Sequence, residues 1–322
     1  MKQFRKKRTE SALIIPKKKK TLKDLLRNIA TSWQLYVLLL PALLYMLVFN
    51  YFPLYGIQIA FKDYKFAWGI EGSPWVGIKH FKTFFESYYF GRLMVNTFLL
   101  NILYLVVSFP FPIFLAVLMN QIRSKARKSF IQTIIYVPHF ISTVVLAGML
   151  YIFLSPSVGI FNSVRELLGL PRFDYMASAG AFRWIYILSG IWQNAGYSTI
   201  LFIASLNSVD TSLYEAADLD GANIWQKIRY IDLPTLLPTA VMVFILDCGK
   251  LLSSNTSKTL VLQTAGNIPT SDIIGVYVYN VGLAKGQFSY TAAIGLFVNI
   301  VNFAMIMMVN RLSKKLSDVS LF

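Results

Sequence analysis

The feature that most constrains this chain is a series of uncharged apolar runs, each long enough to cross a bilayer. A helix rises 1.5 Å per residue, so roughly 20 apolar residues span the ~30 Å hydrocarbon core. Five runs reach that length, at Trp33–Phe61, Leu93–Ile122, Ser129–Val164, Trp184–Val209 and Gly286–Asn310. A sixth, Leu233–Leu246, becomes long enough if it extends past Asp247 toward Leu252. The sequence therefore predicts an all-α, polytopic membrane protein with six transmembrane helices.

The composition agrees with this class, because 56% of the residues are hydrophobic and only 14% are charged. Soluble domains contain about 25% charged residues. The net charge of +16 would also suit a protein that binds nucleic acid. However, the basic residues cluster at the N-terminus and beside the apolar runs, where anionic headgroups lie. We therefore expect membrane lipid, and no nucleic acid, to face these charges.

The distribution of Lys and Arg predicts the orientation, since cytoplasmic loops are enriched in both. Residues 1–27 carry eleven of them and the 123–128 loop carries four. If both termini are cytoplasmic, the inward segments hold twenty of the 31 basic residues. We expect a multi-pass protein with both termini inside the cell.

A polar stretch, DTSLYEAADLDGANIWQKIRYIDLP at residues 210–234, separates the fourth and fifth predicted spans. Ser212 and Glu215 have the spacing of a capping box, which predicts a helix with Ser212 as its N-cap. Gly221 is placed to end this helix in the left-handed conformation, and a second helix is predicted over Ala222–Tyr230. Taken singly, Ser212 and Glu215 need only cap a helix, and Gly221 need only form a turn. On the predicted topology the pair of helices lies at the cytoplasmic face.

The spacing of the whole stretch resembles the EAA loop of binding-protein-dependent ABC importer permeases. The positions that define this motif are matched by Glu215-Ala216-Ala217, Gly221 and Ile231-x-Leu233-Pro234. In that family the loop forms coupling helices, which insert into a cleft on a cytoplasmic ATPase subunit. The resemblance therefore implies the transmembrane fold of a type I ABC importer. It also implies ATPase contacts by Glu215, Ala216, Ala217, Asp218, Gly221 and Ala222.

The resemblance covers roughly residues 90–310 and implies a set of partners. The family pairs two related permeases with two ABC ATPase subunits and an extracytoplasmic solute-binding protein, in a bacterial cell membrane. This chain has no G-x-x-x-x-G-K-[ST] phosphate loop. ATP and Mg²⁺ would then be used by the partner ATPase, and this chain would be a non-catalytic subunit that binds no cofactor.

Four parts follow along the chain on this interpretation. Residues 1–30 are a basic cytoplasmic tail, and residues 31–92 hold the first span and an outward loop. Residues 93–311 form the permease core with its 210–234 loop, and residues 312–322 form a cytoplasmic tail.

Three further segments indicate which branch of the permease family the chain resembles. GIWQNAGYSTILFIASLNSV and VPHFISTVVLAGMLYIFLSPSVGIFN resemble sugar-importer permeases. Residues 271–318 are similar to a branch associated with oligosaccharides from complex polysaccharides of the polygalacturonate or alginate type. The expected solute is an oligosaccharide.

Polar and aromatic side chains inside the spans are the candidates for contact with such a solute. Aromatic rings stack on sugar C–H faces, and amides bond to hydroxyls. Helix–helix hydrogen bonding would explain Gln193 and Asn194 equally well, and Asp247 has the spacing to pair with Lys250 instead. The candidates are Trp192, Gln193, Asn194, Gly196 and Tyr197 in the fourth span, with His139 and Asp247 in neighbouring runs.

Three alternatives stay open on the sequence alone. The first is an ABC permease for another solute class, which the EAA loop does not exclude. The second is a secondary transporter, which would usually place carboxylates at mid-membrane, whereas these spans contain almost none. The third is a membrane-embedded enzyme such as a glycosyltransferase, which would need convergent acids or a metal site at the membrane face.

Overall fold

The computed structural model describes residues 31–317. The predicted N-terminal tail and the last five residues of the predicted C-terminal tail lie outside this range. The described chain separates into two compact units, one that ends at Ile57 and one that begins at Gln58. Throughout residues 31–317 the regular structure is helical, with isolated β-bridges and no strand.

The first unit consists of α2 (Trp33–Met46) and a π-helical continuation over Leu47–Tyr51. A 3-10 segment, Phe52–Phe61, continues the run across the boundary between the units. Pro41 lies inside α2, as is common in membrane helices, where neighbouring groups satisfy the freed carbonyl. The continuous run of 29 residues is the first predicted span.

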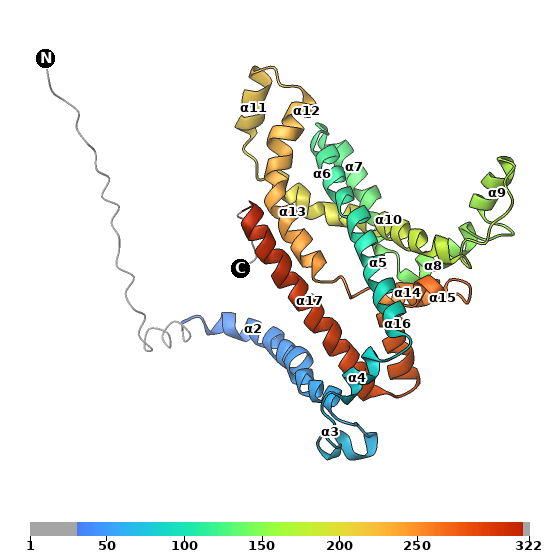
Figure 1. The fold of residues 1–322 in the computed structure, drawn as a ribbon. Coiled ribbons are helices and arrows are strands. Elements are labelled where there is room, and N and C mark those ends of the chain that lie inside the picture. The colour runs from blue at the N-terminus through green and yellow to red at the C-terminus, as the bar shows by residue number, and fades with distance from the viewer. Residues whose placement is uncertain (1–30, 318–322) are drawn as a thin grey trace. The chain divides into compact units, whose positions relative to one another are not determined.

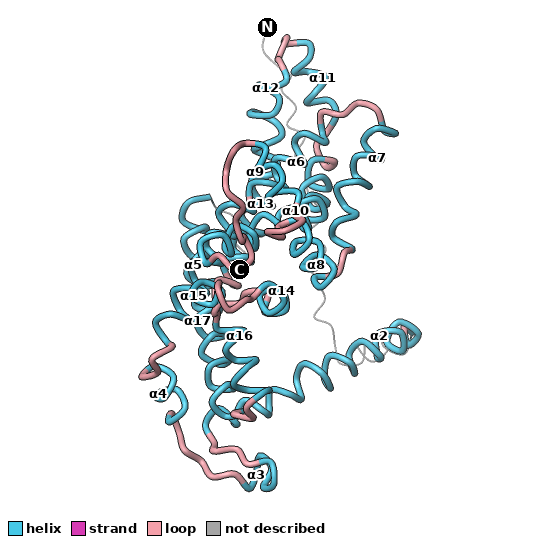
Figure 2. The backbone as a smooth tube through the Cα atoms, turned by 90° about the vertical axis from the view of Figure 1, so that its right-hand side faces the viewer, coloured by secondary structure: helices cyan, strands magenta, loops and turns pink. Residues whose placement is uncertain are grey.

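The second unit contains the remaining helices, drawn in Figures 1 and 2. In chain order they are α3 (Gly69–Gly72), α4 (Lys79–Phe85), α5 (Phe90–Ser108), α6 (Pro110–Asn120), α7 (Lys125–Tyr136), α8 (Thr143–Phe153), α9 (Ile160–Leu167), α10 (Ala179–Leu206), α11 (Thr211–Leu219), α12 (Ile224–Lys227), α13 (Leu233–Cys248), α14 (Thr256–Leu262), α15 (Ile268–Ser271), α16 (Ile274–Val278) and α17 (Phe288–Ser317). Both views place α11 and α12 at one end of this unit, and α3 and α4 toward the opposite end.

Four helical runs in the described chain are long and apolar enough to cross a membrane: Trp33–Phe61, Phe90–Asn120, Ile224–Cys248 and Phe288–Lys315. A fifth span exists if the bent pair formed by Lys125–Phe140 and Thr143–Phe153 is one crossing. The less apolar α10 has 28 residues, a length of about 42 Å. These helices are compatible with six crossings, and that number stays a prediction.

The third predicted span, Ser129–Val164, is not one helix. The chain bends by 95° between Phe140 and Thr143. Pro138 lies just before this break, in a 3-10 turn, and it removes one backbone N–H donor from the helical ladder. Ser142 then starts α8 as its N-cap, with its hydroxyl accepting from the Val145 N–H at 3.3 Å. The bend therefore has a local cause on each side.

Helix α10 is central to the second unit, where it packs against α5, α6, α7, α13 and α14. Its buried face contributes Phe182, Ile187 and Ile191 to one apolar cluster. Phe202 and Leu206 enter a second cluster with α6 and α13. Since α10 contacts helices on several sides, its side chains are well placed to line an internal cavity.

Gly196 lets α10 approach α7 very closely. A Cβ at Gly196 would lie 1.9 Å from the backbone oxygen of Ile135. We expect Gly196→Ala to force the two helices apart and to lower stability by about 2 kcal/mol. Gly295→Ala in α17 is the control, because a Cβ there meets nothing within 4 Å. Thermal unfolding of the two variants in detergent checks this; equal midpoints would contradict it.

Candidate functional site

A cavity of about 680 Å³ lies between α5, α10, α13 and the segment that leads into α14. This volume is within the usual range of small-molecule sites. Polar groups dominate one part of its wall, whereas Phe109, Pro112 and Phe202 line an apolar part. The cavity thus offers hydrogen-bonding groups beside apolar surface, a combination that suits a polyhydroxylated ligand.

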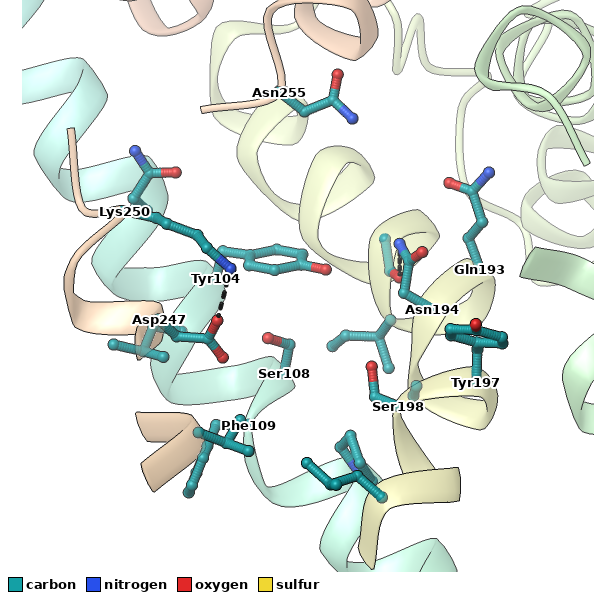
Figure 3. A pocket seen from close by; sticks show the side chains of 18 of the residues that line it. Tyr104, Ser108, Phe109, Gln193, Asn194, Tyr197, Ser198, Asp247, Lys250 and Asn255 are labelled. Carbon is teal, nitrogen blue, oxygen red and sulfur yellow. Dashed lines mark hydrogen bonds and ion pairs between the residues drawn. The ribbon is translucent and has the colours of Figure 1, made fainter. Parts of the chain in front are cut away.

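Figure 3 shows the polar part of the wall. Tyr104 extends from α5 toward Asn194 on α10, with Ser108 one helical turn farther along α5. Asp247 and Lys250, at the end of α13, lie on the other side of Tyr104 and form an ion pair at 3.4 Å. The predicted i, i+3 pairing of these two residues is therefore confirmed. An aromatic face lies here among amide and hydroxyl groups.

Four of the seven candidate pathway residues line this cavity, namely Gln193, Asn194, Tyr197 and Asp247. Gln193 also donates to the backbone oxygen of Ile141 at 2.7 Å. This hydrogen bond joins α10 to the break between the 3-10 turn Val137–Phe140 and α8, so it is a packing contact but not one between two helices, and Gln193 still borders the cavity.

The other three candidates lie outside the lining. Trp192 is about half exposed on the surface of α10, and Gly196 faces α7. His139 lies behind the wall, where its ring stacks on Tyr197 with centroids 4.0 Å apart. Its Nδ1–H donates to Asn194 Oδ1 at 3.1 Å. His139 thus holds two lining side chains in place, and adjacent positions on a helix do not all face one cavity.

Two groups of residues that line the cavity are not among the candidates predicted from the sequence. Asn101, Tyr104 and Ser108 line the cavity from α5. Their i, i+3, i+7 spacing puts three polar side chains on one face of an apolar helix, a signal that was available. Lys258 also lines the cavity, but it belongs to a loop in the predicted topology, and no local pattern places it beside α10.

The 210–234 loop forms two helical segments, as predicted, namely the short helix α11 and the start of the long helical run Ile224–Cys248, but the first begins earlier than predicted. Its N-cap is Asp210, whose Oδ1 accepts from the Ser212 N–H at 2.9 Å. The predicted Ser212–Glu215 capping box is therefore wrong, because an aspartate two residues upstream takes the N-cap position. This hydrogen bond lowers the pKa of Asp210. Glu215 lies past the first turn with an exposed side chain.

The turn between the two helices follows the prediction. Gly221 has φ +69°, and the Ala222 N–H donates to the Ala217 carbonyl at 2.9 Å, which completes a Schellman motif. The second helix starts two residues later than predicted, at Ile224 after the N-cap Asn223. It continues through a π-helical segment, Ile228–Asp232, directly into α13. Two oppositely charged side chains, Asp218 and Lys227, form an ion pair across the turn.

We expect Gly221→Val to disturb this turn without any steric clash, because no atom lies within 4 Å of a Cβ at that position. A β-branched residue at positive φ costs roughly 1–2 kcal/mol. The matched control is Gly169→Val, because Gly169 has φ +72° and equally open surroundings but lies after α9. If the loop couples to an ATPase, as its resemblance to the EAA loop implies, Gly221→Val alone should reduce solute uptake, by about tenfold for a cost of ~1.4 kcal/mol. Equal uptake by the two variants would contradict a special role of the turn.

A buried carboxylate joins this loop to two long helices. Asp232 is fully buried at the start of α13. It accepts hydrogen bonds from Tyr214 Oη at 2.5 Å, Asn120 Nδ2 at 3.1 Å and Gln121 Nε2 at 2.9 Å. Burial, with help from this carboxylate, raises the pKa of Tyr214 to about 12, so the phenol stays protonated and donates. The network ties α11 to the ends of α6 and α13.

Large apolar side chains on the same loop are exposed. Leu219 is 90% exposed, Trp225 79% and Tyr230 71%. Apolar side chains that cluster on a polar surface loop indicate a protein interaction site. The loop also exposes four acids, Asp210, Glu215, Asp218 and Asp220, against two basic residues, Lys227 and Arg229, so a partner with positive groups would suit it.

Comparison with known proteins gives one matching family, described as "Binding-protein-dependent transport system inner membrane component", over residues 108–318. The chain is 39% identical over 305 residues, 95% of either chain, to the polygalacturonan/rhamnogalacturonan transport system permease protein YteP of Bacillus subtilis. It is 38% identical over 288 residues to protein LplB of the same organism, covering 89% of this chain and 91% of LplB.

A solved structure has the same fold. It is a crystal structure of a bacterial ABC transporter involved in the import of the acidic polysaccharide alginate. One of its chains matches with a TM-score of 0.82 and 36% identity, covering 91% of this chain and 99% of that chain. A second structure of a bacterial alginate ABC transporter, in complex with an alginate pentasaccharide-bound periplasmic protein, matches with the same TM-score and identity.

Proposed function

The chain belongs to the family of binding-protein-dependent transport system inner membrane components, and from this premise we propose that it forms half of the membrane pathway of an oligosaccharide importer. The 36% identity to a chain of the alginate importer supports an oligosaccharide released from a complex polysaccharide, as does the relative YteP. The solute would enter a bacterial cell through this permease, with both termini of the chain cytoplasmic.

The partners follow from the same family. The neighbouring structure with a sugar-bound periplasmic protein supports a solute-binding protein on the outer side. A second, related permease would complete the pathway, and two cytoplasmic ABC ATPase subunits would hydrolyse ATP with Mg²⁺. This chain then supplies no hydrolytic group, and its part is to bind the solute and to move.

The observation that carries this proposal is the 210–234 loop. It exposes Glu215 and Leu219 to solvent, while the Asp232 network fixes the loop to α6 and α13. A surface that is accessible to a partner protein and is also attached to long helices can transmit the partner's movement to those membrane helices. Closure of the ATPase pair would shift α11 and α12, and the attached helices would open the cavity toward the outside.

The cavity supplies the other half of the mechanism. Tyr104 presents an aromatic face to the solute, and Asn194 and Ser198 present groups that bond to sugar hydroxyls. The stacking of His139 on Tyr197 keeps that part of the wall in one arrangement. The site therefore binds and orients a sugar chain without any chemical step.

The proposal is tested by reconstituting the whole transporter in proteoliposomes with its binding protein. Uptake of labelled tri-galacturonate should require ATP on the side of the membrane that the ATPase subunits face. It should stop when these subunits are omitted. Uptake driven by an ion gradient without ATPase subunits would instead support the secondary-transporter alternative.

A further inference from the structure

One charged side chain in the cavity wall has no opposite charge beside it. Lys258 in α14 is only 4% exposed, and none of the ion pairs among residues 31–317 includes it. Its Nζ donates to the backbone oxygen of Tyr186 at 2.8 Å and lies 4.7 Å from the centre of the Tyr186 ring. An ammonium group has three N–H donors, so this carbonyl uses only part of its capacity.

The backbone of α10 leaves room for this ammonium. A Cβ at Gly190 would lie 3.1 Å from Lys258 Nζ and 2.6 Å from Tyr104 Cε2. A side chain at position 190 would therefore displace both groups. The glycine keeps Lys258 and Tyr104 next to each other in the wall of the same cavity.

The other charges of the lining cancel each other. Asp247 and Lys250 pair at 3.4 Å, with side chains 40% and 70% exposed. When Lys258 is protonated, the described lining therefore carries a net positive charge. Burial lowers the pKa of Lys258 to about 7, and a bound anion would favour the protonated form. A buried charge without a counter-charge is unfavourable, and an anion in the cavity would supply the missing opposite charge.

We propose that Lys258 binds a carboxylate of the transported sugar chain, so that the cavity selects oligosaccharides built from uronic acids. Hydrogen bonds between an ammonium and a carboxylate are about twice as strong as neutral ones. The Tyr104 ring and the Asn194 amide contact the sugar face and hydroxyls of any sugar, whereas Lys258 distinguishes acidic from neutral units. This inference rests on the proposed function, because it names the substrate class of that cavity.

The test compares two probes in proteoliposomes that hold the complete transporter. The probes are tri-galacturonate and its fully methyl-esterified, uncharged form. Lys258→Gln should lower uptake of the acid about tenfold or more and leave uptake of the ester unchanged. Lys258→Arg should retain most of the acid uptake, since it keeps the positive charge.

The matched control is Lys62→Gln. Lys62 is also buried, donates to the backbone oxygen of Ile70 at 2.7 Å and lies 5.6 Å from the centre of the Trp75 ring. It does not line the cavity. This control should not change the ratio of acid to ester uptake, which separates the role of Lys258 from the loss of any buried lysine.

Three results would overturn the inference. If Lys258→Gln lowers uptake of both probes equally, the residue is only structural. If the wild-type transporter carries only the ester, the cavity does not select uronates, and the proposed function still stands. If the wild-type transporter carries neither probe, the proposed function fails and this inference fails with it.

Discussion

Glu215→Lys is expected to abolish the stimulation of ATP hydrolysis by solute while the subunits remain in the membrane. Glu215 is exposed on α11, so the substitution leaves the fold of this chain intact. Its effect falls on the docked partner, which we expect to offer positive groups to the acidic loop. Like charges placed together at an interface cost several kcal/mol, which predicts a loss of at least about 10-fold in stimulated hydrolysis.

The measurement is ATPase activity of the purified transporter with and without the loaded solute-binding protein. Glu86→Lys is the control, because it makes the same change of charge at an exposed glutamate after α4, at the end of the second unit away from α11. Stimulation should survive in the control. Full stimulation in Glu215→Lys would show that the ATPase docks elsewhere.

Asp232→Ala is expected to have the second large effect, because the hydrogen bonds of Asp232 connect the 210–234 loop to the long helices. Without the carboxylate, the half-buried Tyr214 and Gln121 lose their acceptor, whereas Asn120 Nδ2 still donates to Tyr214 Oη at 3.1 Å. Unsatisfied buried donors cost about 1–3 kcal/mol each, so we expect a loss of about 3 kcal/mol in unfolding free energy. Uptake should fall even where assembled transporter is recovered.

Two milder variants separate coupling from stability. Asp232→Asn keeps the size of the side chain and one acceptor oxygen, and Tyr214→Phe removes only the phenol donor. Both should assemble and hydrolyse ATP, yet transport fewer solute molecules per ATP than the wild type. Asp220→Ala, at an exposed acid in the same loop, should keep the wild-type ratio. An unchanged ratio in all three would limit Asp232 to a structural role.

The fold class followed from the sequence because long uncharged runs have few alternatives to crossing a membrane. The break in the third run was not predicted, although Pro138 marks it. Proline is tolerated within membrane helices, as Pro41 in α2 illustrates. The 95° bend needs a second cause, and Ser142 supplies it by starting a new helix.

The 210–234 loop could be predicted in part because its signals are local. Gly221 ends α11 with the expected positive φ. The N-cap was assigned wrongly, since Asp210 and Ser212 are both good N-caps and only the backbone conformation decides between them. The hydrogen bonds of Asp232 to Asn120 and Gln121 join residues more than 100 positions apart, and no local pattern carries such information.

The cavity was predicted less well for the same reason. The α10 segment pointed to Asn194 and Tyr197, which do line it. Local sequence does not say which face of α10 is turned to the cavity, so Trp192 could not be separated from its neighbours. Lys258 lies in the cavity wall because α14 packs against α10. Such a tertiary contact cannot be predicted from local sequence.

The central claim is that the 210–234 loop docks on a cytoplasmic ATPase, and thiol labelling tests it directly. The chain has a single cysteine, Cys248, so Cys248→Ser with Leu219→Cys leaves one thiol at a position that is 90% exposed. In inside-out vesicles a membrane-impermeant maleimide should label this thiol, and added ATPase subunits should block the labelling. Labelling in right-side-out vesicles, or labelling that the ATPase does not change, would contradict the account.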